Sequence, residues 1–252
     1  AQAAIEAAQA AGEMPSRPLV EADFLRRRAL MLPKEARFDE LLNLPQEADL
    51  GAAIVAAMSA IESAFPPLMG QLPKDYERFD NDLVERMLRT FDSEALRTAS
   101  GDVFGRIYEY FLAQFSVQKA HDNGEFFTPP SLVQLIVNVI EPNRGILLDP
   151  ACGSGGMFVQ TSHFIEQEGL ETMGQVTFYG HEKNETTARL AQTNLAVHGL
   201  QGNIRAGNEA ITYYNDPHDL CGKCDFVMAN PPSNVDEVDA GKVKGDPRLP
   251  FG

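Results

Sequence analysis

The chain has 252 residues, 44% of them hydrophobic, and carries a formal net charge of −15. This length can bury one large core or two modest ones. No stretch reaches the roughly 18 apolar residues that span a bilayer, and no signal peptide opens the chain, so we expect a soluble, cytoplasmic protein. The acidic balance argues against a protein that holds DNA alone by neutralising phosphates, so a nucleic-acid substrate would require a partner chain.

Residues 1–120 are expected to form a helical N-terminal domain. Apolar residues recur at helical spacing in three segments, and Asp49 can cap the first of them. We expect these stripes to face a core; they are Ile54, Val55, Met58, Ile61 and Phe65, then Leu83, Val84, Met87, Leu88 and Phe91, then Val103, Phe104, Ile107, Tyr108, Phe111, Leu112 and Phe115. A basic cluster is typical of a solvated helix face, with a phosphate or partner contact as the alternative; it contains Arg26, Arg27, Arg28, Lys34 and Arg37.

Residues 121–252 alternate strand and helix patterns, which predicts an α/β domain with a parallel sheet and helices on both faces. Thr128 can cap the first helix, with Pro129 in its first turn and these residues facing inward: Leu132, Val133, Leu135, Ile136, Val139 and Ile140. Strands are expected at 146–149, 176–179, 203–205 and 226–229, with helices at 157–165 and 184–197. Open α/β sheets bind ligands at the carboxyl ends of their strands, so we expect the site there.

A glycine loop follows the first strand, with the sequence Asp149, Pro150, Ala151, Cys152, Gly153, Ser154, Gly155 and Gly156. Such a loop aims backbone N–H groups and a helix N-terminus at a small ligand. If the ligand is S-adenosylmethionine, Glu182 after the second strand can accept hydrogen bonds from both ribose hydroxyls. Asn208 after the third strand could bond the adenine edge, or serve only as a turn residue. Phe126 and Thr128 could close over the methionine end, or merely begin a helix.

Asn230, Pro231, Pro232 and Ser233 follow the fourth strand and indicate transfer to an amino nitrogen. An exocyclic amine on an aromatic base is a poor nucleophile, because its lone pair is delocalised into the ring. The Asn230 side-chain oxygen and the Pro231 carbonyl could accept its two hydrogens and favour the pyramidal amine. Positioning would supply most of the remaining catalysis, and no general base is required.

We expect no metal site. Cys221 and Cys224 have the spacing of metal ligands, but the single further cysteine, Cys152, lies in the glycine loop. The five histidines show no pairing at helical spacing.

Three motifs together resemble those of the modification (methyltransferase) subunit of type I restriction-modification systems. They are Gly-Glu-Phe-Phe-Thr-Pro at 124–129, the loop at 149–156 and Ala-Asn-Pro-Pro at 229–232, in the gamma order of DNA adenine-N6 methyltransferases. The resemblance covers about residues 80–252 and is highly specific when the motifs are taken together.

The resemblance implies a Rossmann-like class I S-adenosylmethionine-dependent methyltransferase sheet after the helical domain, in residues 121–252. It implies S-adenosylmethionine as cofactor, double-stranded DNA with a flipped-out adenine as substrate, and a separate specificity subunit that selects the target. A second copy of the chain is an expected partner, and a restriction subunit could join the complex. By the same resemblance, Phe126, Thr128, Glu182 and the loop at 149–156 would hold the cofactor. Because such a sheet has more strands than the four placed here, we expect the protein to continue beyond Gly252.

Ser233 departs from the family pattern, which has an aromatic residue at this position that stacks on the flipped adenine. Loss of stacking should cost about 1–3 kcal/mol. One alternative is therefore a cofactor-binding scaffold or regulatory subunit with weakened or lost catalysis. Another is a methyltransferase acting on glutamine or RNA bases, which the 124–129 motif and the helical domain disfavour.

Overall fold

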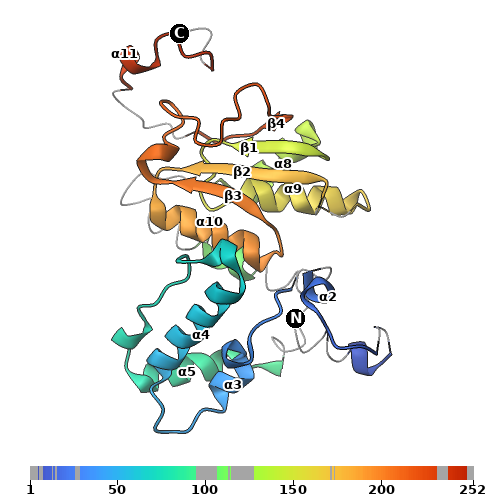
Figure 1. Cartoon of the computed structure of the whole chain (residues 1–252), viewed down its shortest axis with the longest axis vertical. Coiled ribbons are helices and arrows are strands. Elements are labelled where there is room, and N and C mark those ends of the chain that lie inside the picture. Colours follow the sequence, from blue (N-terminus) through green and yellow to red (C-terminus); the bar gives the residue numbers. More distant parts are fainter. Residues whose placement is uncertain are drawn as a thin grey trace. The chain divides into compact units, whose positions relative to one another are not determined.

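The computed structural model describes residues 5, 8–12, 14, 16–25, 29–94, 107–112, 114, 128–170, 172, 174–231 and 238–248. The chain divides into two compact units, residues 1–106 with 196–199 and residues 107–195 with 200–252 (Figure 1). The boundary expected at residue 120 lies outside the described residues, so the division at that position stays a prediction.

The described part of the first unit is helical. Its helices are α2 (Glu21–Leu25), α3 (Phe38–Leu42), α4 (Leu50–Ala64) and α5 (Asn81–Phe91), with 3-10 turns η1 (Lys34–Ala36), η2 (Pro66–Leu68) and η3 (Tyr76–Arg78). Asp49 caps α4 as expected, because its carboxylate accepts a hydrogen bond from the N–H of Ala52 at 2.9 Å. The Asn81 side chain bonds the N–H of Leu50 and the carbonyl of Ala48, which ties the start of α5 to the start of α4.

The expected core stripes are only partly buried. On α5, Val84 is buried, whereas Leu83, Met87 and Phe91 are exposed, so the inward orientation predicted for these three residues is wrong. Spacing identifies the apolar face of a helix but not a neighbour that would cover it. In the third stripe Leu112 is buried and Phe111 is exposed; Val103, Phe104 and Phe115 lie outside the described residues.

Part of the basic cluster fits a solvated face. Lys34 keeps 78% of its side chain exposed and forms a long ion pair with Glu40, at 3.8 Å. Such a pair contributes little to stability. Arg26, Arg27 and Arg28 lie outside the described residues.

The second unit contains a parallel sheet in the strand order β3-β2-β1-β4. Its strands are β1 (Gly145–Asp149), β2 (Val176–Glu182), β3 (Gly202–Ala206) and β4 (Phe226–Val227), which confirms the four expected strands. In the register, Asp149 at the end of β1 pairs with Gly180 of β2, so β2 runs two residues further. The carboxyl ends of β1 and β2 therefore meet at one edge of the sheet.

Three helices share one hydrophobic core with this sheet: α8 (Pro130–Ile140), α9 (Gly156–Gln167) and α10 (Glu185–Val197). Phe158 of α9 packs on Phe178 of β2 with ring centroids 5.2 Å apart. On the other face of β2, the rings of Tyr179 and His181 contact His218 in the loop before β4. The sequence predicted helices on both faces of the sheet. Among the described residues, α8, α9 and α10 share one core, and the loop that contains His218 covers the other face of β2.

Helix α8 differs from expectation in its orientation. Val133 and Val137 are buried, but Leu132, Leu135 and Val139 are exposed, with Val139 at 74%. The inward orientation predicted for these three residues is wrong, because α8 presents only one narrow stripe to α9 and the sheet. Two short elements complete the unit, η4 (Gly207–Ala210) and α11 (Ala240–Val243). In the part of the chain that the structure describes, no helix is both long and apolar enough to cross a membrane.

Candidate active site

The glycine loop joins β1 to α9 as the sequence predicted. Gly153 and Gly155 have φ angles of 54° and 79°, a left-handed conformation that side chains rarely adopt. The N–H of Cys152 donates to the carbonyl of His181 on β2 at 2.9 Å, and the N–H of Gly155 donates to the Cys152 carbonyl at 2.8 Å. The end of β2 therefore fixes the shape of the loop.

Glu182 lies against this loop, as expected for a residue that binds the same ligand. Its carboxylate accepts the N–H of Gly153 at 3.1 Å and the N–H of Asn184 at 2.7 Å. A carboxylate has about four acceptor sites, so Glu182 can accept further hydrogen bonds from a ligand. The structure thus brings together two groups that are 29 residues apart in the chain.

Asp149 at the end of β1 has a different environment. It is 1% exposed, and its carboxylate accepts the N–H of Ala151 at 3.0 Å. Burial raises the pKa of Asp149, and the nearby charge of Glu182 acts in the same direction, whereas this hydrogen bond acts to lower it; the resulting pKa is about 7. Burial also raises the pKa of the Cys152 thiol, so this cysteine is an inert packing residue of the loop. Asp149 is therefore a buried carboxyl bonded to the loop, whereas Glu182 is half-buried at the end of β2.

Asn208 is the predicted residue with the least support. It lies in η4 directly after β3, and its side chain is exposed. The Asn215 side chain donates to the backbone carbonyl of Asn208 at 3.2 Å, which is a contact typical of a turn. Among the described residues, no hydrogen bond joins the Asn208 side chain to Glu182 or to the glycine loop, so its role stays a prediction.

Asn230 follows β4 at the same edge of the sheet and is hydrogen-bonded to Thr128. The amide nitrogen of Asn230 donates to the Thr128 hydroxyl at 2.8 Å across 102 residues of sequence. Thr128 does not cap α8, because the helix begins at Pro130 and Pro129 occupies the capping position without a side-chain bond. The capping role expected for Thr128 is therefore wrong. Pro231 is exposed; Phe126, Pro232 and Ser233 lie outside the described residues.

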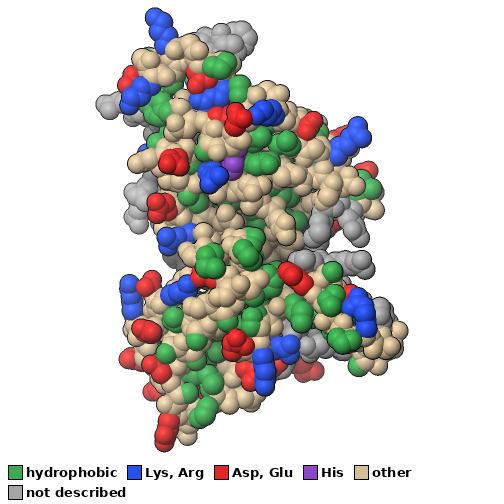
Figure 2. All heavy atoms as spheres, viewed as in Figure 1, with side chains coloured by type: hydrophobic (Ala, Val, Ile, Leu, Met, Phe, Trp, Pro, Cys, Tyr) green, Lys and Arg blue, Asp and Glu red, His purple; other side chains and the backbone are tan. Residues whose placement is uncertain are grey.

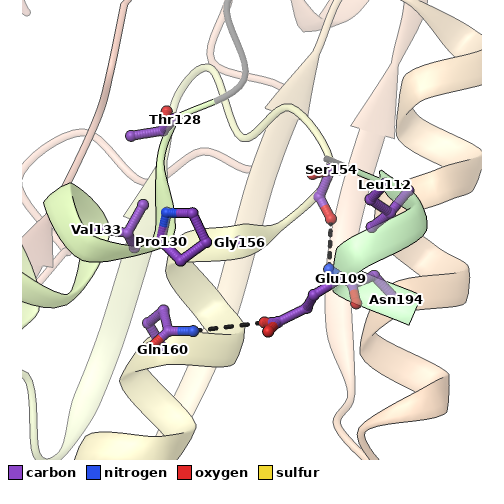
Figure 3. Close-up of a pocket in the computed structure, with 9 residues that line it drawn as sticks. All are labelled: Glu109, Leu112, Thr128, Pro130, Val133, Ser154, Gly156, Gln160 and Asn194. Carbon is purple, nitrogen blue, oxygen red and sulfur yellow. Dashed lines mark hydrogen bonds between the residues drawn. The ribbon is translucent and has the colours of Figure 1, made fainter. Parts of the chain in front are cut away.

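A small pocket opens between the glycine loop and four helical segments, residues 107–112, α8, α9 and α10 (Figure 3). Thr128, Ser154 and Gly156, all predicted site residues, lie on its wall. The remaining lining residues were not predicted: Glu109, Leu112, Pro130, Val133, Gln160 and Asn194. Figure 3 shows Asn194 of α10 directed at the loop, where its amide donates to the Ser154 carbonyl at 2.9 Å. The sequence places Asn194 within a predicted helix, but helical spacing does not show that it is buried or which loop it supports.

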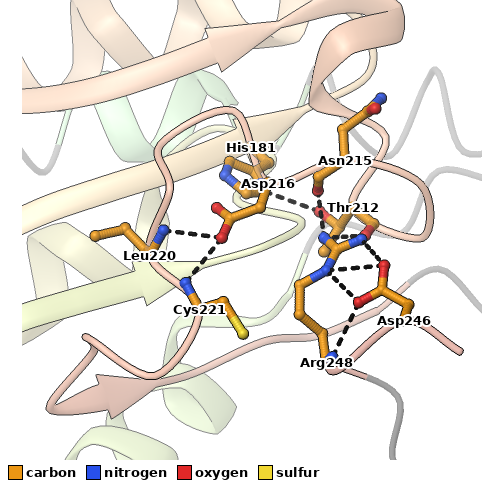
Figure 4. Close-up of polar contacts among 8 residues, drawn as sticks. All are labelled: His181, Thr212, Asn215, Asp216, Leu220, Cys221, Asp246 and Arg248. Atoms are coloured by element: carbon orange, nitrogen blue, oxygen red, sulfur yellow. Dashed lines mark hydrogen bonds and ion pairs between the residues drawn. The ribbon is translucent and has the colours of Figure 1, made fainter.

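A second polar cluster supports the glycine loop from the other side (Figure 4). The Thr212 hydroxyl donates to the carbonyl of Pro150 at 2.6 Å and lies 3.0 Å from His181 Nδ1. Because this hydroxyl has one hydrogen, His181 must donate through Nδ1. Burial lowers the pKa of His181 to about 4, and the neighbouring His218 lowers it further, so the ring is neutral near pH 7.

Arg248 anchors the end of the described chain to this cluster. Its guanidinium donates to the Thr212 carbonyl at 3.0 Å, contacts the Asn215 carbonyl, and forms a forked pair with Asp246. These hydrogen bonds lower the pKa of Asp246 to about 2. Neither Thr212 nor Arg248 was predicted, since their partners lie in other segments of the chain.

The described residues contain no group of three or more His, Cys, Asp and Glu side chains that could hold a metal ion. Cys221 and Cys224 are free thiols. Figure 2 shows one face of the molecule, on which Lys and Arg are scattered among Asp and Glu within each unit rather than gathered into one basic surface.

The family model described as N-6 DNA Methylase matches residues 99–252. The chain is 36% identical over 235 residues to the type I restriction enzyme MjaIX methylase subunit of Methanocaldococcus jannaschii, a match that covers 91% of this chain and 41% of that protein. It is 38% identical over 163 residues to the HindI methylase subunit of Haemophilus influenzae, covering 65% of this chain and 36% of that protein. The chain thus spans less than half the length of these curated relatives.

The fold also matches a solved structure, the type I restriction-modification system methyltransferase subunit from Streptococcus thermophilus. The TM-score is 0.68, with 88% of this chain and 49% of that chain covered. At 23% sequence identity this likeness shows a shared fold.

Proposed function

The chain belongs to the N-6 DNA methylase family, and on this premise we propose that it forms part of the modification subunit of a type I restriction-modification enzyme. The proposed reaction transfers a methyl group from S-adenosylmethionine to the N6 amine of a flipped-out adenine in duplex DNA. The proposed partners are a specificity subunit, which selects the target sequence, and a second copy of the modification subunit.

The meeting of Glu182 and Asn230 at the carboxyl edge of one sheet carries this proposal. Glu182 ends β2 and bonds the glycine loop after β1, and Asn230 follows β4, the strand paired to the other side of β1. A cofactor held by the first group would therefore be next to a target amine held by the second.

The residues present fit the cofactor. A side-chain carbon added to Gly153 or Gly156 would meet nothing within 4 Å, so the loop faces open space at these two residues. The N-terminus of α9, a helix of 12 residues, favours a ligand with an anionic end. We propose that Glu182 holds the ribose hydroxyls and that the loop, Phe126 and Thr128 hold the remainder. When bound, S-adenosylmethionine supplies an electrophilic sulfonium methyl.

Asn230 and Pro231 perform the remaining chemistry in this proposal. The amide oxygen of Asn230 and the carbonyl of Pro231 accept the two hydrogens of the adenine amine, which concentrates its lone pair on nitrogen. In this reaction S-adenosylhomocysteine would leave and the surplus proton of the methylated amine would pass to water. Neither acceptor changes its protonation state, so the site would work by orientation and need no general base.

Ser233 is the observation that favours a second candidate, a cofactor-binding subunit with weakened catalysis. A serine has no ring on which the flipped adenine can stack, and base–aromatic stacking contributes about 1–3 kcal/mol. Ser233→Phe should then raise the rate of methyl transfer about ten- to hundredfold and leave cofactor affinity nearly unchanged.

The test is transfer of labelled methyl from S-adenosylmethionine into duplex DNA. The full-length subunit is co-expressed with the products of the adjoining genes, and the DNA is digested to nucleosides for identification. Label in N6-methyladenine that is lost in Asn230→Ala and kept in Asn138→Ala, an exposed asparagine on α8, would support the proposal. Cofactor binding without label, with activity restored by Ser233→Phe, would favour the second candidate. Label in another product would contradict both.

A further inference from the structure

One hydrogen bond connects two of the sequence motifs directly. Thr128 belongs to the motif before α8, and Asn230 begins the motif after β4; the Asn230 amide nitrogen and the Thr128 hydroxyl oxygen are 2.8 Å apart. Asn230 is exposed and Thr128 is half-buried. An exposed amide is free to rotate unless a specific partner holds it, and Thr128 is that partner.

The Thr128 hydroxyl is not used by the helix that it precedes. The first N–H groups of α8 that bond backwards, those of Leu132 and Val133, donate to the carbonyl of Pro129 at 2.9 and 3.1 Å. The helix starts at Pro130 and has no side-chain cap. A hydroxyl that contributes nothing to its own helix is available to orient a neighbouring side chain.

The direction of the bond decides what Asn230 offers to a substrate. An asparagine side chain has one donor end and one acceptor end, and these are nearly identical in shape. The adenine amine donates hydrogens, so it can be bound only by the acceptor end. Because the Asn230 amide nitrogen donates to Thr128, the Asn230 amide oxygen is the atom left to accept a hydrogen from the amine. With the amide rotated by half a turn, the Thr128 hydroxyl would donate to the Asn230 oxygen, and the Asn230 nitrogen would face the amine as a second donor.

We propose that Thr128 is a positioning residue for the transfer step: its hydroxyl holds the Asn230 amide with the oxygen directed at the target amine. This inference rests on the proposed function and adds to it a role for Thr128 that cofactor binding does not include. It predicts a defect in the chemical step that is separate from cofactor affinity, because the reacting group itself is misaligned when the bond is lost.

The variant Thr128→Val keeps the shape of the side chain and removes the acceptor. The amide of Asn230 then has no preferred orientation, and we expect the single-turnover rate of methyl transfer to fall about tenfold, the effect of losing one hydrogen bond of typical strength. Thr128→Ser retains the hydroxyl and should stay within about twofold of the parent. Thr193→Val is the matched control, since the half-buried Thr193 on α10 donates to the carbonyl of Arg189 in its own helix.

The experiment measures two quantities in the full complex, with saturating DNA and S-adenosylmethionine. One is the single-turnover rate, and the other is the dissociation constant of S-adenosylmethionine by calorimetry. The parent is the unmodified chain or Ser233→Phe, whichever transfers methyl faster. A rate that falls in Thr128→Val by more than any change in the dissociation constant accounts for, and that recovers in Thr128→Ser, supports the proposal.

Three results would overturn it. An unchanged rate in Thr128→Val means that the hydrogen bond does not orient the amide. A weakened dissociation constant that accounts for the whole loss means that Thr128 acts only on the cofactor. If neither parent transfers methyl to DNA, the proposed function fails and the positioning role fails with it, whereas the first two results leave the proposed function intact.

Discussion

Two carboxylates at neighbouring strand ends have different tasks because their surroundings differ. Asp149 is buried beneath the loop and has one backbone N–H as partner, whereas Glu182 is half-buried and accepts two. Water stabilises an ionised carboxylate, and burial removes that stabilisation. Asp149 is therefore driven toward its neutral form, with a pKa of about 7.

The buried position of Asp149 predicts a pH-dependent stability. Its pKa is about 7 in the folded protein and near the ordinary 3.8 in the unfolded chain. Between these values the folded protein binds a proton that the unfolded chain has released, so this contribution is full below pH 4 and is lost as the pH rises through 7. Asp149→Asn removes the titration. We expect the unfolding free energy of the parent, relative to Asp149→Asn, to fall by about 1–3 kcal/mol between pH 5 and pH 8.

Denaturant unfolding of both proteins at the two pH values measures this difference. Asp82→Asn, at an exposed position on α5, is the matched control for the exchange of a carboxylate for an amide. Parallel pH dependences for Asp149→Asn and the parent would mean that the buried carboxyl does not retain its proton.

The positions of candidate site residues could be predicted from the sequence only where strand ends defined them. Glu182 and Asn230 each follow a strand whose pattern was recognisable, and the carboxyl edge of a parallel sheet brings such positions together. Thr128 and Thr212 were missed or assigned otherwise, because their hydroxyls bond partners 102 and 62 residues away. A hydroxyl can cap its own helix or reach a distant group, and local sequence does not distinguish the two.

At the scale of elements, β2 serves as the template for the glycine loop. The backbone carbonyl of His181 on β2 accepts the Cys152 N–H, and Gly180 leaves room for the Cys152 side chain. A side-chain carbon added to Gly180 would lie 2.9 Å from the Cys152 sulfur and 2.7 Å from a methyl of Ile204. The absence of a side chain at this one position allows the loop to rest on the strand.

Gly180→Ala should therefore displace the loop. We expect a loss of about 1–3 kcal/mol of stability from overpacking, and a weaker affinity for S-adenosylmethionine because Gly153 and its N–H move with Cys152. Gly202→Ala on β3 is the matched control: the added carbon would lie 2.7 Å from a methyl of Leu195, away from the loop. Thermal unfolding and calorimetry separate the two effects. If both variants lowered cofactor affinity equally, general destabilisation would explain the loss and the contact with Cys152 would not.

Helix orientation was the weakest part of the sequence prediction. The patterns located α4, α5, α8, α9 and α10, since apolar residues at helical spacing mark a helix whatever covers it. They could not show that Val139 of α8 is exposed while Val137 is buried. Burial depends on the neighbouring element, and this becomes known only when the chain is folded.

At the scale of the whole molecule, the chain that carries the candidate site is strongly acidic. Its net charge is −15, and on the face shown in Figure 2 the basic side chains are interspersed with acidic ones. Binding of DNA by charge requires contacts that release counterions from phosphates, and an acidic surface repels the same phosphates. The proposed cofactor site, which includes the N-terminus of α9 and the Glu182 carboxylate, does not depend on that balance. Affinity for the cofactor and affinity for DNA should therefore be supplied by different chains.

We expect the full-length subunit alone to bind S-adenosylmethionine as tightly as the complex does. We expect it to bind duplex DNA at least about 100-fold more weakly than the complex at 150 mM salt, which is the lower range of the gap between specific and non-specific binding. Calorimetry gives the first affinity, and fluorescence anisotropy with a labelled duplex gives the second, from 50 to 300 mM salt. The complex should show the steeper loss of DNA affinity with salt, because its partner supplies the phosphate contacts. Equal DNA affinities and equal salt slopes would show that the modification subunit holds DNA itself, through a surface that its overall charge conceals.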